Sequence, residues 1–161
     1  MTVKAVSAGF ISVAWRLARR RWADLSGEGA RLKGGRWNSP GKAAVYLSDD
    51  AALPVLEALV HLDLPPDLIP DDYALMRVDL SALETATPGS WLEDGPENLI
   101  TETESKAFGD RWIVEARTPV LRVPSIVVPE SLNLILNPNH RLASSIPEPA
   151  IRSFEFDPRL F

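Results

Sequence analysis

The chain has 161 residues, of which 45% are apolar and 24% are charged, so its length and composition predict a single domain, residues 1–161, with one hydrophobic core. The absence of cysteine excludes a disulfide framework and a thiolate metal site, and the two histidines show no ligand spacing, so we expect no metal and no bound cofactor. No stretch of about 18 apolar residues is present, and the first apolar stretch precedes its positive charges, the reverse of a secretory signal, so we expect a cytoplasmic protein without a membrane span.

The net charge of −5 is unevenly distributed along the chain. Residues 1–42 contain nine Lys or Arg and two Asp or Glu, whereas residues 49–104 contain one Arg and fourteen Asp or Glu. The basic part suits a ligand that carries phosphate, although an ordinary solvated surface has the same composition. The acidic part argues against nucleic acid as a direct partner.

The first half of the chain predicts two strands and one helix. A β-branched, apolar stretch indicates a strand at residues 13–17, with Arg16 near its end. Residues 26–30 are typical of a glycine-rich loop, and a short apolar run at residues 43–47 is typical of a buried strand. Asp49 and Asp50 then supply N-cap side chains for a helix at residues 50–62.

The second half of the chain predicts four strands and one helix. The strands are expected at residues 73–80, 119–128, 132–136 and near 154–156, with Ser125 in the middle of the second of them. Thr101 and Glu104 form a capping box for a helix that ends near residue 115. Because strands and helices do not alternate regularly, the order of elements predicts an α+β domain rather than a doubly wound sheet.

Residues that suit a ligand site are concentrated around Gly34-Gly35-Arg36-Trp37-Asn38. Two glycines permit a tight turn or a close approach to a ligand, and the following arginine offers a planar fork of donors to phosphate or carboxylate. Tyr46 follows ten residues after Arg36, and Glu57 eleven residues after Tyr46. These three side chains suit an anionic, aromatic ligand. From spacing alone, the commoner arrangement is a glycine turn, a surface arginine, a core tyrosine and a solvated glutamate beside His61.

Several segments resemble, in the same order, the RES domain, a family named for an arginine, a glutamate and a serine. The segments are Gly34-Gly35-Arg36-Trp37-Asn38, Val45-Tyr46, Leu56-Glu57-Ala58-Leu59-Val60-His61, Gly109-Asp110-Arg111-Trp112, Val123-Pro124-Ser125 and Asn137-Pro138-Asn139-His140. The resemblance extends from about Trp15 to Phe161. It implies an ADP-ribosyltransferase-like core of two packed, mostly antiparallel sheets with a ligand cleft between them and a few helices.

The resemblance also implies that the chain acts on NAD⁺ and assigns roles to six residues. Cleavage of the nicotinamide–ribose bond creates an oxocarbenium-like centre, which needs a carboxylate nearby, cations for the pyrophosphate and an aromatic face for nicotinamide. Glu57 is expected to be the catalytic carboxylate, and Tyr46 to stack on nicotinamide. Arg36 is expected to anchor the phosphate or the ribose, with Arg16 as a second cation. Ser125 is expected to bind the ribose or to position the Arg and Glu, and Asn137 to bind NAD⁺ or to form a turn. Trp37 is expected in the core, and the roles of His61 and His140 stay open.

The resulting hypothesis is a toxin of a bacterial type II toxin–antitoxin pair that cleaves NAD⁺ by hydrolysis or phosphorolysis and arrests growth. One alternative is a mono-ADP-ribosyltransferase that modifies a host-cell protein, because the sequence does not choose between water, phosphate and a protein as acceptor. A second alternative is a non-catalytic binding module for a helix-turn-helix partner. The resemblance implies an Xre-type helix-turn-helix antitoxin that covers the cleft near Arg36, and a homodimer of the toxin within the complex.

Overall fold

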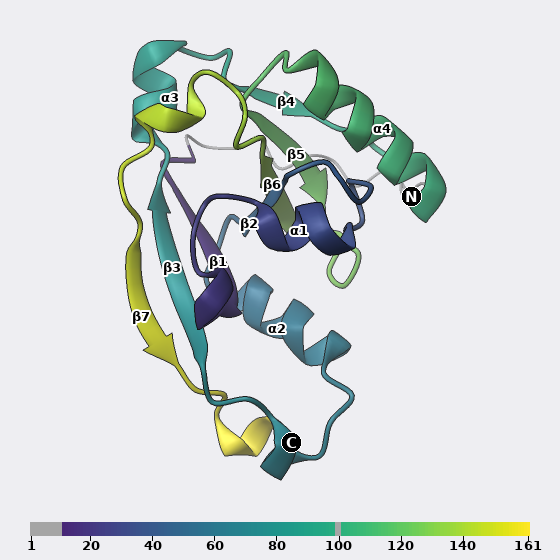
Figure 1. The fold of residues 1–161 in the computed structure, drawn as a ribbon, viewed down its shortest axis with the longest axis vertical. Coiled ribbons are helices and arrows are strands. Elements are labelled where there is room, and N and C mark those ends of the chain that lie inside the picture. The colour runs from purple at the N-terminus through teal and green to yellow at the C-terminus, as the bar shows by residue number, and fades with distance from the viewer. Residues whose placement is uncertain (1–10, 99–100) are drawn as a thin grey trace.

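The computed structural model describes residues 11–98 and 101–161 and arranges them around one seven-stranded sheet (Figure 1). The strand order is β4-β5-β6-β2-β1-β3-β7, in which β4 and β5 are parallel and every other pair is antiparallel. The strands are β1 (Val13–Arg19), β2 (Val45–Ser48), β3 (Tyr73–Asp79), β4 (Leu92–Asp94), β5 (Val120–Pro124), β6 (Leu132–Leu136) and β7 (Ala150–Phe154). The α-helices are α1 (Glu28–Lys33), α2 (Ala52–His61), α3 (Ser81–Ala86) and α4 (Glu102–Glu115). The predicted α+β, mostly antiparallel architecture is confirmed.

The joint between β1 and β2 divides the sheet into two unequal groups of strands. β1 pairs with β3 along its whole length, from Val13 to Arg19, but it pairs with β2 only through Trp15 and Ser48. Beyond that pair the two strands separate. The expected two sheets are therefore two groups of strands, β4-β5-β6-β2 and β1-β3-β7, that one residue pair joins into a single sheet. A strand pair held at one point leaves room for a cleft beside it.

Strands β5, β6 and β2 are largely buried on both faces because their apolar side chains alternate between two clusters. Along β6, Leu134 and Leu136 belong to one cluster and Ile135 to the other. The first cluster is closed by residues of α3 and of the segment after β6, including Leu83 and Ile146. The second is closed by Trp37 and by residues of α4. A strand buried on both faces reads as a continuous apolar run, which is why residues 132–136 were recognisable from sequence.

Helix α4 packs directly on the backbone of the Gly34–Asn38 segment. A Cβ atom at Gly109 would overlap the carbonyl oxygen of Trp37, so the glycine that weakens the helix is required for this contact. The ring of Trp37 meets Phe108 of α4 edge-to-face, with 6.2 Å between ring centroids. The helix begins at the predicted capping box of Thr101 and Glu104. Trp37 is 5% exposed, so its predicted core position is confirmed.

Four local expectations differ from the structure. The glycine-rich stretch at residues 26–30 contains the start of α1, because Gly27 adopts a left-handed conformation (φ 71°) at the N-cap. Strand β1 continues to Arg19, two residues beyond its predicted end. Residues 92–94, for which no element was expected, form β4, which is three residues long and pairs with β5. Strand β5 ends at Pro124, so Ser125 follows the strand instead of lying within it.

No helix in the described parts of the chain is both long enough and apolar enough to cross a membrane.

Candidate functional site

A cleft of about 540 Å³ opens where β1 and β2 separate. Residues 16–19 of β1 line one side and residues 46–48 of β2 line the other, and α2 contributes Pro54, Glu57, Ala58 and His61. The Gly34–Trp37 segment, α1, the turn after β5 and Asn133 of β6 also line the cleft. Figure 1 shows α1 and α2 in front of the middle strands of the sheet. Four of the six predicted site residues line this cleft: Arg16, Arg36, Tyr46 and Glu57.

Glu57 is held by two neutral donors from different parts of the fold. Helix α2 starts where Asp50 Oδ1 accepts hydrogen bonds from the backbone N–H groups of Ala52 and Leu53, at 2.7 and 2.9 Å. Glu57 lies in this helix, five residues after Ala52. Its Oε1 accepts hydrogen bonds from Ser125 Oγ and from Asn133 Nδ2, both at 2.7 Å. The carboxylate is half-buried, and these contacts replace the expected pairing with His61.

Ser125 reaches Glu57 because it shapes the turn after β5. Its side chain accepts hydrogen bonds from the backbone N–H groups of Val127 and Val128, each at 3.2 Å, and its own N–H donates to Ser131 O at 2.9 Å. With its oxygen accepting from the turn, the hydroxyl proton is directed at Glu57. Ser125 is fully buried and does not line the cleft. Its position therefore supports the expected positioning of Glu57 more than direct contact with a ligand.

Arg16 is a charged side chain lining the cleft with few contacts of its own. Its guanidinium donates to the backbone oxygen of Trp22 at 3.1 Å, while its buried Nε has no hydrogen-bond partner among the residues that the structure describes. Burial lowers the pKa of Arg16, an effect that nearby Asp24 opposes. A buried donor without a partner costs free energy, and an anionic ligand would remove that cost.

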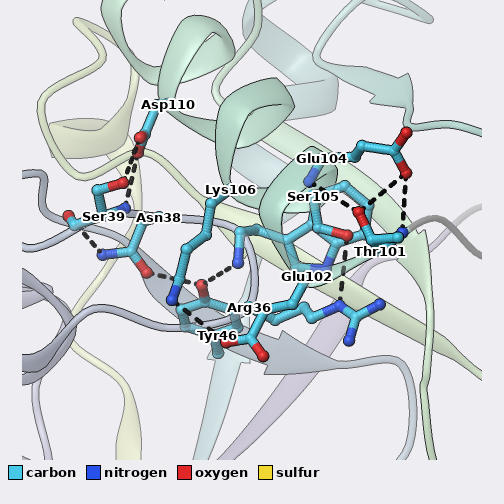
Figure 2. A network of polar contacts seen from close by, with 11 residues as sticks. Arg36, Asn38, Ser39, Tyr46, Thr101, Glu102, Glu104, Ser105, Lys106 and Asp110 are labelled. Atoms are coloured by element: carbon cyan, nitrogen blue, oxygen red, sulfur yellow. Dashed lines mark hydrogen bonds and ion pairs between the residues drawn. The ribbon is translucent and has the colours of Figure 1, made fainter.

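Arg36 extends from the Gly34–Asn38 segment toward α4. Its Nε donates to Ser105 Oγ at 3.3 Å, a long contact to a fully buried serine (Figure 2). The segment itself is a tight turn, in which Gly35 N donates to Asn38 O at 2.9 Å and Gly34 has φ 74°. Positive φ at Gly34 strains any other residue, so the first glycine of the motif serves the turn.

Tyr46 joins the cleft to this turn through its hydroxyl group. The hydroxyl donates to Asn38 Oδ1 at 2.7 Å and accepts from the backbone N–H of Trp37 at 2.9 Å (Figure 2). Burial raises the pKa of Tyr46, so the phenol stays protonated near neutral pH. A Cβ at Gly35 would collide with the Tyr46 hydroxyl, which explains the second glycine. Tyr46 also lines the cleft.

The structure places Asn137 and His140 away from the cleft lining. Asn137 Nδ2 donates to Ile113 O at 3.1 Å, and its Oδ1 accepts from Asn139 N at 3.1 Å. His140 Nδ1 accepts from Leu142 N at 3.1 Å. Both side chains are buried and form the turn after β6. Asn137 thus fits the turn-forming alternative, because its amide is used by backbone groups. His61 lines the cleft and is exposed.

The cleft residues that sequence reasoning did not find include Trp22, Lys33, Ser48 and Asn133. Asn133 is the most informative, because an asparagine inside the apolar run 132–136 of a buried strand needs hydrogen-bond partners. That signal was present in the sequence. Its partners were not, since Ser48 and Glu57 lie 85 and 76 residues away.

Comparison with known proteins identifies the family to which this fold and this cleft belong. A profile of the RES domain matches residues 13–158. The chain belongs to the RES domain family of toxins. A "Prs ADP-ribosylating toxin" of Sphingobium sp. (strain YBL2) is 40% identical to this RES-domain chain over 140 residues, which cover 85% of this chain and 86% of the relative. A "Toxin Res" of Pseudomonas putida is 33% identical over 155 residues, which cover 92% and 99%.

The fold of this RES-domain chain also occurs in a solved structure. A chain of the M. tuberculosis MbcT–MbcA toxin–antitoxin complex matches with a TM-score of 0.67 and 19% identity, over 90% of this chain and 85% of that chain. At this identity the likeness shows the shared fold alone. The predicted family is therefore confirmed by sequence, and the arrangement of the strands by structure.

Proposed function

We propose that this RES-domain chain is the toxin of a bacterial toxin–antitoxin pair and that it cleaves the nicotinamide–ribose bond of NAD⁺. The observation that carries the proposal is the cleft itself, in which an oriented carboxylate on α2 and the cation Arg16 on β1 line one cavity with Tyr46. The name of the Sphingobium relative supports an activity that uses ADP-ribose.

The proposed chemical step breaks one bond and forms one. The ribose C1′–nitrogen bond of NAD⁺ breaks, and its electron pair neutralises the pyridinium, so nicotinamide leaves uncharged. Positive charge develops on C1′ and the ring oxygen of the ribose. The acceptor oxygen then bonds to C1′ and loses its proton to solvent or a base. Glu57 stabilises the developing charge and accepts a hydrogen bond from a ribose hydroxyl.

Arg16 and Arg36 complement the pyrophosphate of NAD⁺ in this proposal. Arg16 supplies a guanidinium whose Nε gains a hydrogen-bond partner when phosphate binds. Arg36 lies at a tight turn that presents it to the same cleft. Tyr46 supplies the aromatic face for nicotinamide while its hydroxyl keeps that turn in place.

The acceptor of ADP-ribose separates two versions of this function. With water or phosphate, the enzyme depletes cellular NAD⁺ as a glycohydrolase or phosphorylase. With a protein side chain, it is a mono-ADP-ribosyltransferase, and the name of the 40% identical relative favours this second version. Both versions share the cleavage step and the role of Glu57.

The toxin assignment also implies control by a partner. We infer an antitoxin of the Xre helix-turn-helix type in the cytoplasm, a segment of which covers the cleft near Arg36, and a homodimer of the toxin within that complex. The presence of the fold in a toxin–antitoxin complex supports an antitoxin partner. A complex in which NAD⁺ still reaches the cleft freely would contradict occlusion.

The deciding experiment is product analysis with a matched pair of proteins. The purified chain and Glu57→Gln are each incubated with NAD⁺, with and without phosphate, and the products are identified by mass spectrometry. We expect nicotinamide from the parent chain and a loss of rate of about 10²–10³-fold in Glu57→Gln, because the neutral amide no longer stabilises the developing charge. Formation of ADP-ribose identifies water as the acceptor, and formation of ADP-ribose 1-phosphate identifies phosphate.

A cell lysate with labelled NAD⁺ tests the protein acceptor. Label that appears on a protein with the parent chain but not with Glu57→Gln supports ADP-ribosyl transfer. If the folded parent chain releases no nicotinamide in either setting, the cleavage proposal is wrong. A binding module for a helix-turn-helix partner is then the remaining function.

A further inference from the structure

A polar chain behind Glu57 is not explained by the roles assigned so far. Asn133 Nδ2 donates to Glu57 Oε1 at 2.7 Å, and Ser48 Oγ donates to Asn133 Oδ1 at 2.9 Å. Ser48 and Asn133 are directly opposite each other in the β2–β6 register, and both line the cleft. Ser48 is 2% exposed, so this contact is shielded from solvent.

The chemistry of the three groups fixes the direction of this chain. An ionised carboxylate only accepts hydrogen bonds, so Asn133 must present its NH₂ group to Glu57 and not its oxygen. Its amide oxygen then faces Ser48, whose hydroxyl can donate. If Ser48 did not donate, the amide could turn over and place its oxygen against the carboxylate.

Two donors from separate elements also restrict the rotation of the Glu57 side chain. Ser125 approaches from the turn after β5, and Asn133 approaches from β6. Both hydrogen bonds are accepted by Oε1, so Oε2 accepts neither of them. A glutamate with three rotatable bonds has several orientations on a helix surface, and a donor on each side selects one.

We propose that Asn133 is a positioning residue that orients Glu57 and that Ser48 fixes the amide of Asn133 in the required direction. Asn133 acts through Glu57 by holding Oε1, so that Oε2 faces the ribose of NAD⁺. The inference rests on the proposed function of Glu57. It deepens that function by naming the residues that orient the carboxylate.

The sharpest test is Asn133→Asp, which keeps the shape of the side chain and replaces the donor by a carboxylate. Near neutral pH two carboxylates would then meet at hydrogen-bond distance, so we expect nicotinamide release to fall by about 10²-fold. As pH is lowered the pair takes up one proton and regains a donor, so activity recovers in part while the parent chain shows no such rise. An Asn133→Asp protein with the parent's rate and pH profile would overturn the proposal.

Two further variants separate orientation from binding. Asn133→Ala removes the donor and Ser48→Ala removes the group that fixes the amide, so we expect kcat to fall by about 10²-fold and about tenfold, with KM for NAD⁺ within about threefold. Leu136→Val, which removes one buried methylene from the same strand, is the control for stability and should lower Tm without changing kcat. A rise in KM at unchanged kcat in the Asn133 variants would show that Asn133 contacts substrate directly, and would overturn the positioning role.

A spectroscopic measurement keeps the inference testable if the parent chain does not cleave NAD⁺. Glu57 is labelled with ¹³C at its carboxyl carbon, and its chemical shift is compared at one pH in the parent, Ser48→Ala and Asn133→Asp chains. The proposal expects the signal to move most in Asn133→Asp, which loses the donor to Glu57 Oε1, and less in Ser48→Ala, which loses only the group that fixes the amide. Identical signals in all three folded proteins would refute the contact, whereas moved signals without NAD⁺ cleavage would refute only the proposed function.

Discussion

The carboxylate side and the cationic side of the cleft differ in how completely their charged groups are satisfied. Glu57 accepts two 2.7 Å hydrogen bonds from neutral side chains, one of which is itself fixed by Ser48. Within the described part of the chain, Arg16 donates one hydrogen bond to a backbone oxygen and its buried Nε has no partner. The fold therefore orients its carboxylate before any ligand binds, but it leaves the buried guanidinium to be completed by one. This is the arrangement expected if the anionic part of a ligand supplies binding free energy and Glu57 acts on the reacting bond.

On the cationic side of the cleft, the largest effect is expected at Arg16. In Arg16→Met we expect KM for NAD⁺ to rise by about tenfold or more with a smaller change in kcat, because a charge-assisted contact to phosphate is lost from bound substrate and transition state alike. The kinetic pattern is the opposite of that for Glu57→Gln, which lowers kcat. Steady-state kinetics of the two variants measure kcat and KM for each. Equal effects on kcat would show that the two sides of the cleft do not differ in role.

The same Arg16→Met variant should retain its stability. Burial lowers the pKa of Arg16 because the charged form is poorly solvated, and an apolar side chain of similar length avoids this cost. We expect the free energy of unfolding to fall by no more than about 1 kcal/mol, the value of the lost bond to Trp22. Urea unfolding measures it. A loss of several kcal/mol would show that Arg16 is a structural residue.

A loss of stability is expected for Tyr46→Phe, which removes the hydroxyl that links the cleft to the Arg36 turn. The change leaves Asn38 Oδ1 and the backbone N–H of Trp37 without the tyrosine hydroxyl, and we expect a loss of about 1–3 kcal/mol of unfolding free energy. Tyr73→Phe is the matched control for stability, because Tyr73 is the chain's other tyrosine and packs its ring on Phe156. If both variants unfold at the parent's urea concentration, the hydroxyl does not hold the turn.

The smallest effect is expected outside the cleft, at His140. Burial and the neighbouring charge of Arg141 lower the pKa of His140 below its usual value of 6.5, so the unfolded chain takes up this proton at higher pH than the folded chain. The stabilising contribution is therefore complete above about pH 6.5 and is lost as pH falls through the lower, folded-state pKa. In His140→Asn we expect a weaker fall in unfolding free energy between about pH 7.5 and 5.5, a range in which carboxylates stay ionised. An unchanged pH dependence would contradict a neutral, buried His140.

Local signals predicted most of the secondary structure because their causes are local. The capping box at Thr101, the apolar run of β6 and the aspartates before α2 each act within a few residues, and each element appeared where expected. The short α1 and β4 were missed because each depends on tertiary contacts. Helix α1 is held by the Asn38 side chain, whose Nδ2 donates to Ala30 O, and β4 pairs with β5.

The candidate site was predictable only in part, for a similar reason. The sequence motifs and the family resemblance named Arg36, Tyr46 and Glu57, and the fold brings them to one cleft together with Arg16. Asn137 resembled a binding residue because a turn asparagine and a ligand asparagine look alike in sequence. Its hydrogen bonds to Ile113 and Asn139 reveal the turn.

The sequence by itself determined the family, the α+β class and the candidate site residues of the proposed NAD⁺ chemistry, because these follow from local patterns and from motifs that keep their order along the chain. The tertiary structure decided how those residues are used. Because β1 and β2 pair only at Trp15 and Ser48, a cleft opens between them. Asn133 contacts Glu57, from which it is separated by 76 positions in the sequence. Such contacts depend on strand register and packing, which no short stretch of sequence specifies.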